Sequence, residues 1–234
     1  MTTLPIAQQS AEIDQFLEQL KSPAPGPSIA TGRLIFALDA TASRQPTWDQ
    51  ACHIQGAMFE ATAGLGSLDI QLVYYRGYNE CKASRWLSSA ALLHYAMRSV
   101  YVVGGNTQIE RILAHAITET KRQKVSALVF VGDAMEEKVD VLCALAGELG
   151  SLGVPIFIFQ EGNLPAATST FRLLAQLSKG AHLSFDLAAI DRLKQLLAAV
   201  AVYAAGGYAA LEDYSRKQGG EALRLTHQME GHRQ

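Results

Sequence analysis

An aspartate and two hydroxyl residues stand at alternate positions just after the first strongly apolar run of the chain. They are Asp39, Thr41 and Ser43, and the run before them covers residues 34–38. A continuous apolar run of this length predicts a strand buried on both faces, with Asp39 at its carboxyl end. Ligands of open α/β sheets bind at this edge. Carboxylate and hydroxyl oxygens are the ligands that Mg²⁺ or Mn²⁺ prefers, so the motif could hold a divalent ion.

Two further segments could add oxygen ligands at the same edge. Thr107 follows Gly104 and Gly105 in a glycine-rich turn that leads into an amphipathic segment, and Asp133 follows the apolar run 127–131. Parallel neighbouring strands bring Asp39 and Asp133 to one edge of the sheet, and the loop of Thr107 can fold between them. The three loops together supply two carboxylates and three hydroxyls.

Each of these side chains also has a purely structural interpretation. Thr107 and Glu110 have the spacing of a capping box, Asp133 has the same spacing to a glutamate, and Ser43 could cap the helix that follows it. Asp39 is harder to explain in this way, because a carboxylate that ends an apolar strand needs a partner. The residues alone leave both interpretations open.

The segments that must position these residues alternate between strand and helix patterns. Apolar runs at 34–38, 127–131 and 155–159 predict buried parallel strands. Residues 68–75, followed by a turn and the polar run 81–85, predict a hairpin that adds an antiparallel edge strand. This order predicts the α/β class: a three-layer α/β/α open sheet, mostly parallel with one antiparallel edge strand.

The chain of 234 residues is expected to hold one main domain with two extensions. An N-terminal helix and a proline-rich linker take residues 1–32, and the main domain takes residues 33–205. Residues 206–234 form a C-terminal extension or tail, loosely held from residue 215 onward. Residues 196–211 are almost wholly apolar but too short to span a bilayer, so we expect a packed helix and no membrane.

Composition and charge restrict the kinds of partner. The formal net charge is −2, so nothing favours binding to nucleic acid. Three cysteines far apart in sequence form no CxxC pair, which argues against a disulfide framework and against a zinc site. The N-terminal residues lack the pattern of a signal peptide. These features are typical of a cytoplasmic protein with reduced thiols, and we expect a bacterial one.

The oxygen-ligand residues give the chain a resemblance to a known family. It is similar to the von Willebrand factor A (VWA) domain with its metal-ion-dependent adhesion site (MIDAS). That family carries Asp-x-Ser-x-Ser after the first strand, a threonine in a second loop and an aspartate after the fourth strand. Asp39 and Ser43 match the first motif, with Thr41 in place of its first serine. Thr107 and Asp133 match the other two positions.

This resemblance, which extends over the predicted main domain, implies binding rather than catalysis. Thr41, Ser43 and Thr107 would bind Mg²⁺ (or Mn²⁺) directly, while Asp39 and Asp133 would act directly or through water. One coordination position would remain open for an Asp or Glu carboxylate of a protein partner. The resemblance therefore implies an adaptor or scaffold that is not an enzyme.

A second resemblance implies a different class of protein. The Asp-x-Thr-x-Ser motif is also similar to the phosphorylated motif of haloacid-dehalogenase-like phosphatases and phosphotransferases. This resemblance implies that Asp39 is a covalent nucleophile. Asp133 and Glu137 would then hold magnesium, and Thr107 would bind phosphate. The hydrolases of that family need a second aspartate where Thr41 stands, which makes this the weaker alternative.

Overall fold

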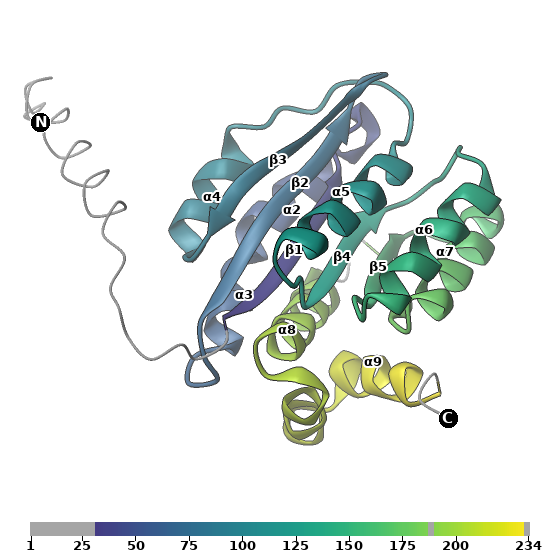
Figure 1. Ribbon diagram of the computed structural model, residues 1–234. Coiled ribbons are helices and arrows are strands. Elements are labelled where there is room, and N and C mark those ends of the chain that lie inside the picture. The colour runs from purple at the N-terminus through teal and green to yellow at the C-terminus, as the bar shows by residue number, and fades with distance from the viewer. Residues whose placement is uncertain (1–30, 187–189, 232–234) are drawn as a thin grey trace, which may run out of the picture.

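A mixed six-stranded sheet forms the centre of the molecule, with the strand order β3-β2-β1-β4-β5-β6 (Figure 1). The computed structural model describes residues 31–186 and 190–231; the predicted N-terminal helix and nearly all of the linker lie outside these ranges. β2 and β3 pair antiparallel, and every other neighbouring pair is parallel. The strands are β1 (Gly32–Asp39), β2 (Leu68–Arg76), β3 (Glu80–Leu87), β4 (Ala127–Gly132), β5 (Ile156–Glu161) and β6 (Ala181–Phe185). The predicted fold class is confirmed.

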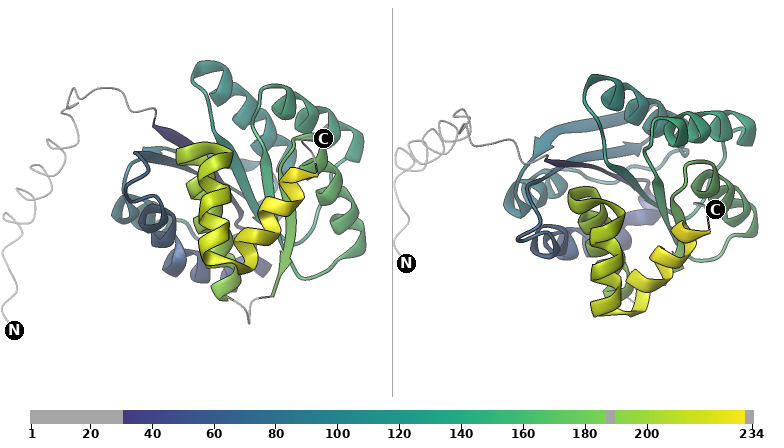
Figure 2. Two further views of the ribbon diagram at one scale, coloured as in Figure 1. Left: turned by 90° about the horizontal axis from the view of Figure 1, so that it is seen from below. Right: turned by 60° about the horizontal axis from the view of Figure 1, so that its bottom comes forward.

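Helices cover both faces of the sheet, because successive side chains of each buried strand point to opposite faces. Leu34 and Phe36 of β1 face one core, and Ile35 and Ala37 face the other. The first core lies beneath α2, α3, α4, α8 and α9, and the second beneath α5, α6 and α7 (Figures 1 and 2). The helices are η1 (Ala42–Arg44), α2 (Gln45–Ile54), α3 (Gly56–Ala61), α4 (Ala90–Arg98), α5 (Ile109–Arg122), α6 (Val139–Ser151), α7 (Pro165–Leu177), α8 (Ile190–Gln218) and α9 (Gly220–Glu230).

The C-terminal residues pack on the domain, so the expectation of a loosely held tail is wrong for residues 215–231. α8 bends at Gly207, and α9 lies against it and against β6 (Figure 2). Leu225 and Met229 of α9 are buried in the first core. The chain reverses at Gly219 and Gly220, whose φ angles of 65° and 54° favour glycine. The few apolar residues of α9 are interspersed with polar and charged ones, which gives the segment the composition of a tail.

α8 is the helix that the sequence marks as apolar. In the described part of the chain, its segment Asp191–Gln218 is long and apolar enough to cross a membrane. Half of its most apolar 18-residue stretch is buried inside the molecule, and the helix packs against β1, β4 and α3. Buried core helices have the same length and composition, so the packing agrees with the expected packed helix.

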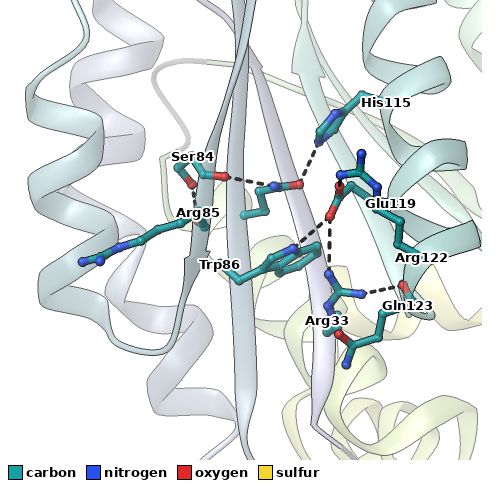
Figure 3. A network of polar contacts seen from close by, with 9 residues as sticks. Arg33, Ser84, Arg85, Trp86, His115, Glu119, Arg122 and Gln123 are labelled. Atoms are coloured by element: carbon teal, nitrogen blue, oxygen red, sulfur yellow. Dashed lines mark hydrogen bonds and ion pairs between the residues drawn. The ribbon is translucent and has the colours of Figure 1, made fainter. Parts of the chain in front are cut away.

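A polar network, drawn in Figure 3, holds the edge strand β3 and helix α5 onto β1. It includes Arg33 near the start of β1, at the end opposite Asp39. Glu119 of α5 accepts a hydrogen bond from the Trp86 indole at 3.0 Å, and its carboxylate lies 3.5 Å from the Arg33 guanidinium. The Arg33 guanidinium stacks 3.8 Å from the Trp86 ring centroid. His115 hydrogen-bonds to the Gln71 side chain at 2.8 Å, and Gln71 donates to the backbone of β3. These contacts fix the sheet without involving the predicted site.

Candidate metal centre

The Asp-x-Thr-x-Ser motif lies in the loop between β1 and α2. Asp39 ends β1 and is 4% exposed, and its Oδ1 accepts a hydrogen bond from the Thr41 amide at 2.7 Å. The hydroxyl oxygens of Thr41 and Ser43 are 3.5 Å apart. Adjacent ligands of an octahedral Mg²⁺ ion are about 3 Å apart, so the two hydroxyls are close to the spacing that one ion needs. Ser43 lies inside η1, and the N-cap position of the following helix α2 is Arg44, without a side-chain cap, so the capping interpretation of Ser43 is not supported.

Asp39 lies beside a second buried polar group. Burial raises the pKa of Asp39, while the hydrogen bond from the Thr41 amide opposes the shift. The Tyr75 hydroxyl is fully buried and has no hydrogen-bond partner of acceptable geometry among the described residues. Burial, followed by the charge of the Asp39 carboxylate, raises the pKa of Tyr75 far above its ordinary value. A nearby cation would stabilise the ionised form of Asp39.

The loop that carries Thr107 crosses the same edge of the sheet. Its Val103 amide donates to the carbonyl of Ala40, directly after Asp39, at 3.0 Å. Its Asn106 amide donates to the carbonyl of Gly77, at the end of β2, at 3.2 Å. A Cβ atom on Gly105 would lie 2.0 Å from the Gly77 carbonyl oxygen. Only glycine therefore allows this approach, which places Thr107 over the ends of β1 and β2.

Thr107 is hydrogen-bonded to the loop after β4. Its hydroxyl donates to the Glu137 carboxylate and accepts from the Glu136 amide, the latter at 3.0 Å. The same Glu137 carboxylate accepts from the Ile109 and Glu110 amides at the start of α5. α5 is therefore capped by a residue from another loop, and the predicted capping box of Thr107 and Glu110 is not formed. The sequence gives no signal of this contact, because cap and helix are far apart along the chain.

Asp133 is paired with an arginine that the sequence analysis did not single out. Arg44 follows the motif directly and is 4% exposed. Its Nη1 lies 3.1 Å from Asp133 Oδ2, and its Nη2 pairs with Glu161 at the end of β5 and donates to Thr47. Like Asp39, Glu161 is a carboxylate residue at the end of a largely apolar strand. The predicted strand ends at residue 159, so the sequence pattern does not place Glu161 at a strand end.

The donor set fits a hydrated divalent ion in part. Asp39, Thr41 and Ser43 supply oxygens, and none of the ion pairs found among the described residues involves Asp39. Thr107 and Asp133 lie in adjoining loops, but Glu137 and Arg44 hold their side chains. The described residues contain no group of three or more His, Cys, Asp or Glu side chains arranged for a metal. A centre built mainly from hydroxyls would not include such a group.

No protein-family model matches the sequence, and no curated protein matches it. Solved structures do match the fold. The VWA domain of SpRpn10 has a TM-score of 0.56 at 14% identity, covering 70% of this chain and 95% of that one. A von Willebrand factor type A protein from Catenulispora acidiphila has a TM-score of 0.60 at 14% identity, covering 72% and 42%.

A third match is a protein with a metal in its motif. Proximal thread matrix protein 1 from the mussel byssus, with a zinc-occupied MIDAS motif, has a TM-score of 0.58 at 15% identity. The alignment covers 72% of this chain and 45% of that protein. Identities this low establish the shared architecture and do not transfer the metal. The sheet order, the antiparallel edge strand and these matches together show that the chain has the fold of a VWA domain.

Proposed function

We propose that this chain is a protein-binding VWA domain whose contact with its partner depends on a divalent ion. Mg²⁺ or Mn²⁺ would be held at the carboxyl edge of β1 and β4. The single observation that carries the proposal is that three loops with oxygen donors contact one another at this edge. The donors are Asp39, Thr41, Ser43, Thr107 and Asp133.

In this proposal, some residues of the site supply negative charge for the ion and others fix the orientation of its ligands. The buried Asp39 carboxylate supplies negative charge, and the Thr41 amide fixes its orientation. The ion supplies positive charge and an open position that an Asp or Glu carboxylate of the partner can take. Thr107 and Asp133 are already engaged by Glu137 and Arg44, so an ion that binds them must displace or share these contacts. Binding is therefore expected to compete with these two internal contacts.

Exposed aromatic side chains near this edge suit a protein partner. Tyr78, in the turn between β2 and β3, is 74% exposed, and Tyr101, in the loop that leads to Thr107, is 67% exposed. The Arg76 guanidinium stacks on the Tyr101 ring, 4.1 Å from the ring centroid. This contact restricts the motion of the Tyr101 side chain. Tyrosine and arginine are enriched in the centres of protein interfaces. We also propose a cytoplasmic location, since all three cysteines are free thiols.

The proposal is tested by capturing partners with the full chain as bait, in magnesium and in chelator. We expect at least one protein that wild type retains in magnesium and loses in EDTA, and that Asp39→Ala fails to retain. Asp140→Ala, which removes an exposed carboxylate from α6, is the matched control and should behave as wild type. An identical set of captured proteins with and without chelator would contradict metal-dependent binding.

A phosphatase assay on the same proteins distinguishes the enzymatic alternative. The substrate is p-nitrophenyl phosphate with magnesium, and we expect no phosphate release above buffer. Magnesium-dependent phosphate release that disappears in Asp39→Ala would contradict the binding function. It would indicate that Asp39 accepts the phosphoryl group and passes it to water.

A further inference from the structure

A second candidate site lies between α7, β6, α8 and α9, in a groove of about 620 Å³. None of the five proposed metal-site residues contributes to it. Its charged and titratable lining side chains are all basic: Arg172, Arg192, Arg224, His182 and His227. Volumes of this size are typical of pockets for small molecules.

The positive charge of the groove is only partly neutralised. Glu221 pairs through one oxygen with Arg192 Nε at 2.9 Å and with Arg224 Nη1 at 3.2 Å. Arg172 makes no ion pair or side-chain hydrogen bond with any described residue. Three guanidinium groups against one carboxylate leave a net charge of about +2 before any histidine is protonated. Burial, and then the charge of Arg172, lowers the pKa of His182 to about 4, so His182 is neutral at pH 7.

The fold assembles this groove with specific contacts. β6 is an edge strand, and the Gln228 side chain of α9 pairs with the backbone of His182. Gln228 Oε1 accepts from the His182 amide, and Gln228 Nε2 donates to the His182 carbonyl, both at 2.9 Å. This pairing occupies the open edge as a further strand would. It also fixes the face of α9 that carries Arg224 and His227 toward Arg172 of α7.

We propose that this groove binds the phosphate group of a small phosphorylated molecule. The doubly negative charge of a phosphate monoester matches the net charge of the arginine cluster. Guanidinium groups bind phosphate oxygens with two parallel hydrogen bonds, and the nitrogens of Arg172 are available for this. Arg192 and Arg224 each keep nitrogens beyond the one that contacts Glu221. The inference does not depend on the proposed function of the Asp39 edge.

Calorimetric titration of the full chain at constant ionic strength tests this proposal, with inorganic phosphate and pyrophosphate as probes. We expect saturable binding that Arg172→Gln and Arg224→Gln each weaken by about tenfold, the effect of losing one charged hydrogen bond. Arg172 is exposed and makes no ion pair within the described part of the chain, so its substitution should leave the fold intact. Arg85→Gln, which removes an exposed arginine from β3, should bind as wild type.

Two further measurements separate this site from other sources of binding. Asp39→Ala should bind phosphate as wild type does, because the groove shares no residue with the metal centre. Phosphate binding lost in Asp39→Ala and kept in Arg172→Gln would overturn the assignment. Succinate, a dicarboxylate with the same charge, should bind at least tenfold more weakly. Equal binding of succinate, or no saturable phosphate binding, would also overturn it.

Discussion

At the scale of residues, Arg44 changes the charge of the candidate metal centre. It is buried, and it contacts carboxylates at the ends of β4 and β5, Asp133 and Glu161. The charge that a divalent ion would supply to Asp133 is therefore supplied internally. A buried guanidinium between two carboxylates contributes to stability only while its partners remain in place. Metal binding and the stability of the metal-free protein are thus expected to be coupled through this residue.

Replacing Arg44 tests this coupling. In Arg44→Gln, Glu161 loses its cation, so we expect the free energy of unfolding in EDTA to fall by about 3 kcal/mol. Asp133 becomes available, so magnesium should bind more tightly than to wild type and recover part of the stability. Urea denaturation with and without magnesium measures both effects. Arg85→Gln should change stability by less than about 0.5 kcal/mol, and weaker magnesium binding by Arg44→Gln would contradict competition.

Gly105 provides a test of how the second loop is positioned. In Gly105→Ala the new Cβ would overlap the Gly77 carbonyl, so the loop must move and carry Thr107 with it. We expect magnesium affinity to fall while the circular dichroism of the sheet is unchanged. Gly104→Ala is the matched control, because its Cβ meets nothing closer than Ala42 at 4.0 Å. Equal magnesium affinities of the two variants would show that the position of this loop is unimportant.

At the scale of elements, the edge strand β3 depends on the network around Glu119. Glu119→Ala leaves the buried Arg33 guanidinium and the Trp86 indole without their shared acceptor. We expect the free energy of unfolding to fall by about 3 kcal/mol. Glu148→Ala is the control, because it removes an exposed ion pair with Lys121. Its free energy of unfolding should fall by less than about 1 kcal/mol. Equal losses in the two variants, measured by urea denaturation, would contradict a structural role for the network.

The sequence predicts the elements that are continuous and apolar, and it misses those that are short or mixed. β1, β4, β5 and the β2–β3 hairpin follow from their patterns within one or two residues. β6 is missed because its five residues include His182 and Ser184, and α7 because it begins with proline and several hydroxyl residues. The packing of α9 depends on the pairing of Gln228 with β6, which no local pattern indicates.

The candidate site, too, could be predicted only where its residues follow a recognisable local pattern. Asp39, Thr41 and Ser43 could be found because they are close in sequence and follow a recognisable strand. Their proximity to Asp133 follows from the order of the parallel strands. The loop of Thr107 follows helix α4 and is held there by backbone contacts with Ala40 and Gly77. The contacts of Arg44 and Glu137 could not be predicted, because the proximity of two loops does not determine which of their side chains meet.

At the scale of the whole molecule, stability should depend on pH through His182. Its pKa is lowered to about 4 by burial and by Arg172, against an ordinary value of 6.5. Between these values the unfolded chain binds more protons than the folded one, so stability is lost as pH falls from 6.5 to 4. A shift of this size corresponds to about 3 kcal/mol.

Urea denaturation at pH 4.5 to 7.5 measures this dependence. His182→Gln should lower stability at pH 7 but show a flatter slope below pH 6.5 than wild type. Equal slopes in the two proteins would mean that His182 is not the group responsible.

The central claim is that the carboxyl edge of β1 and β4 binds a divalent ion through Asp39. Titration of the full, chelator-treated chain with magnesium chloride in a calorimeter tests it most directly. We expect one ion to bind per chain in wild type, with binding lost in Asp39→Ala, weakened in Thr107→Ala and unchanged in Asp140→Ala. Absence of binding to wild type, or equal binding to Asp39→Ala, would contradict the claim.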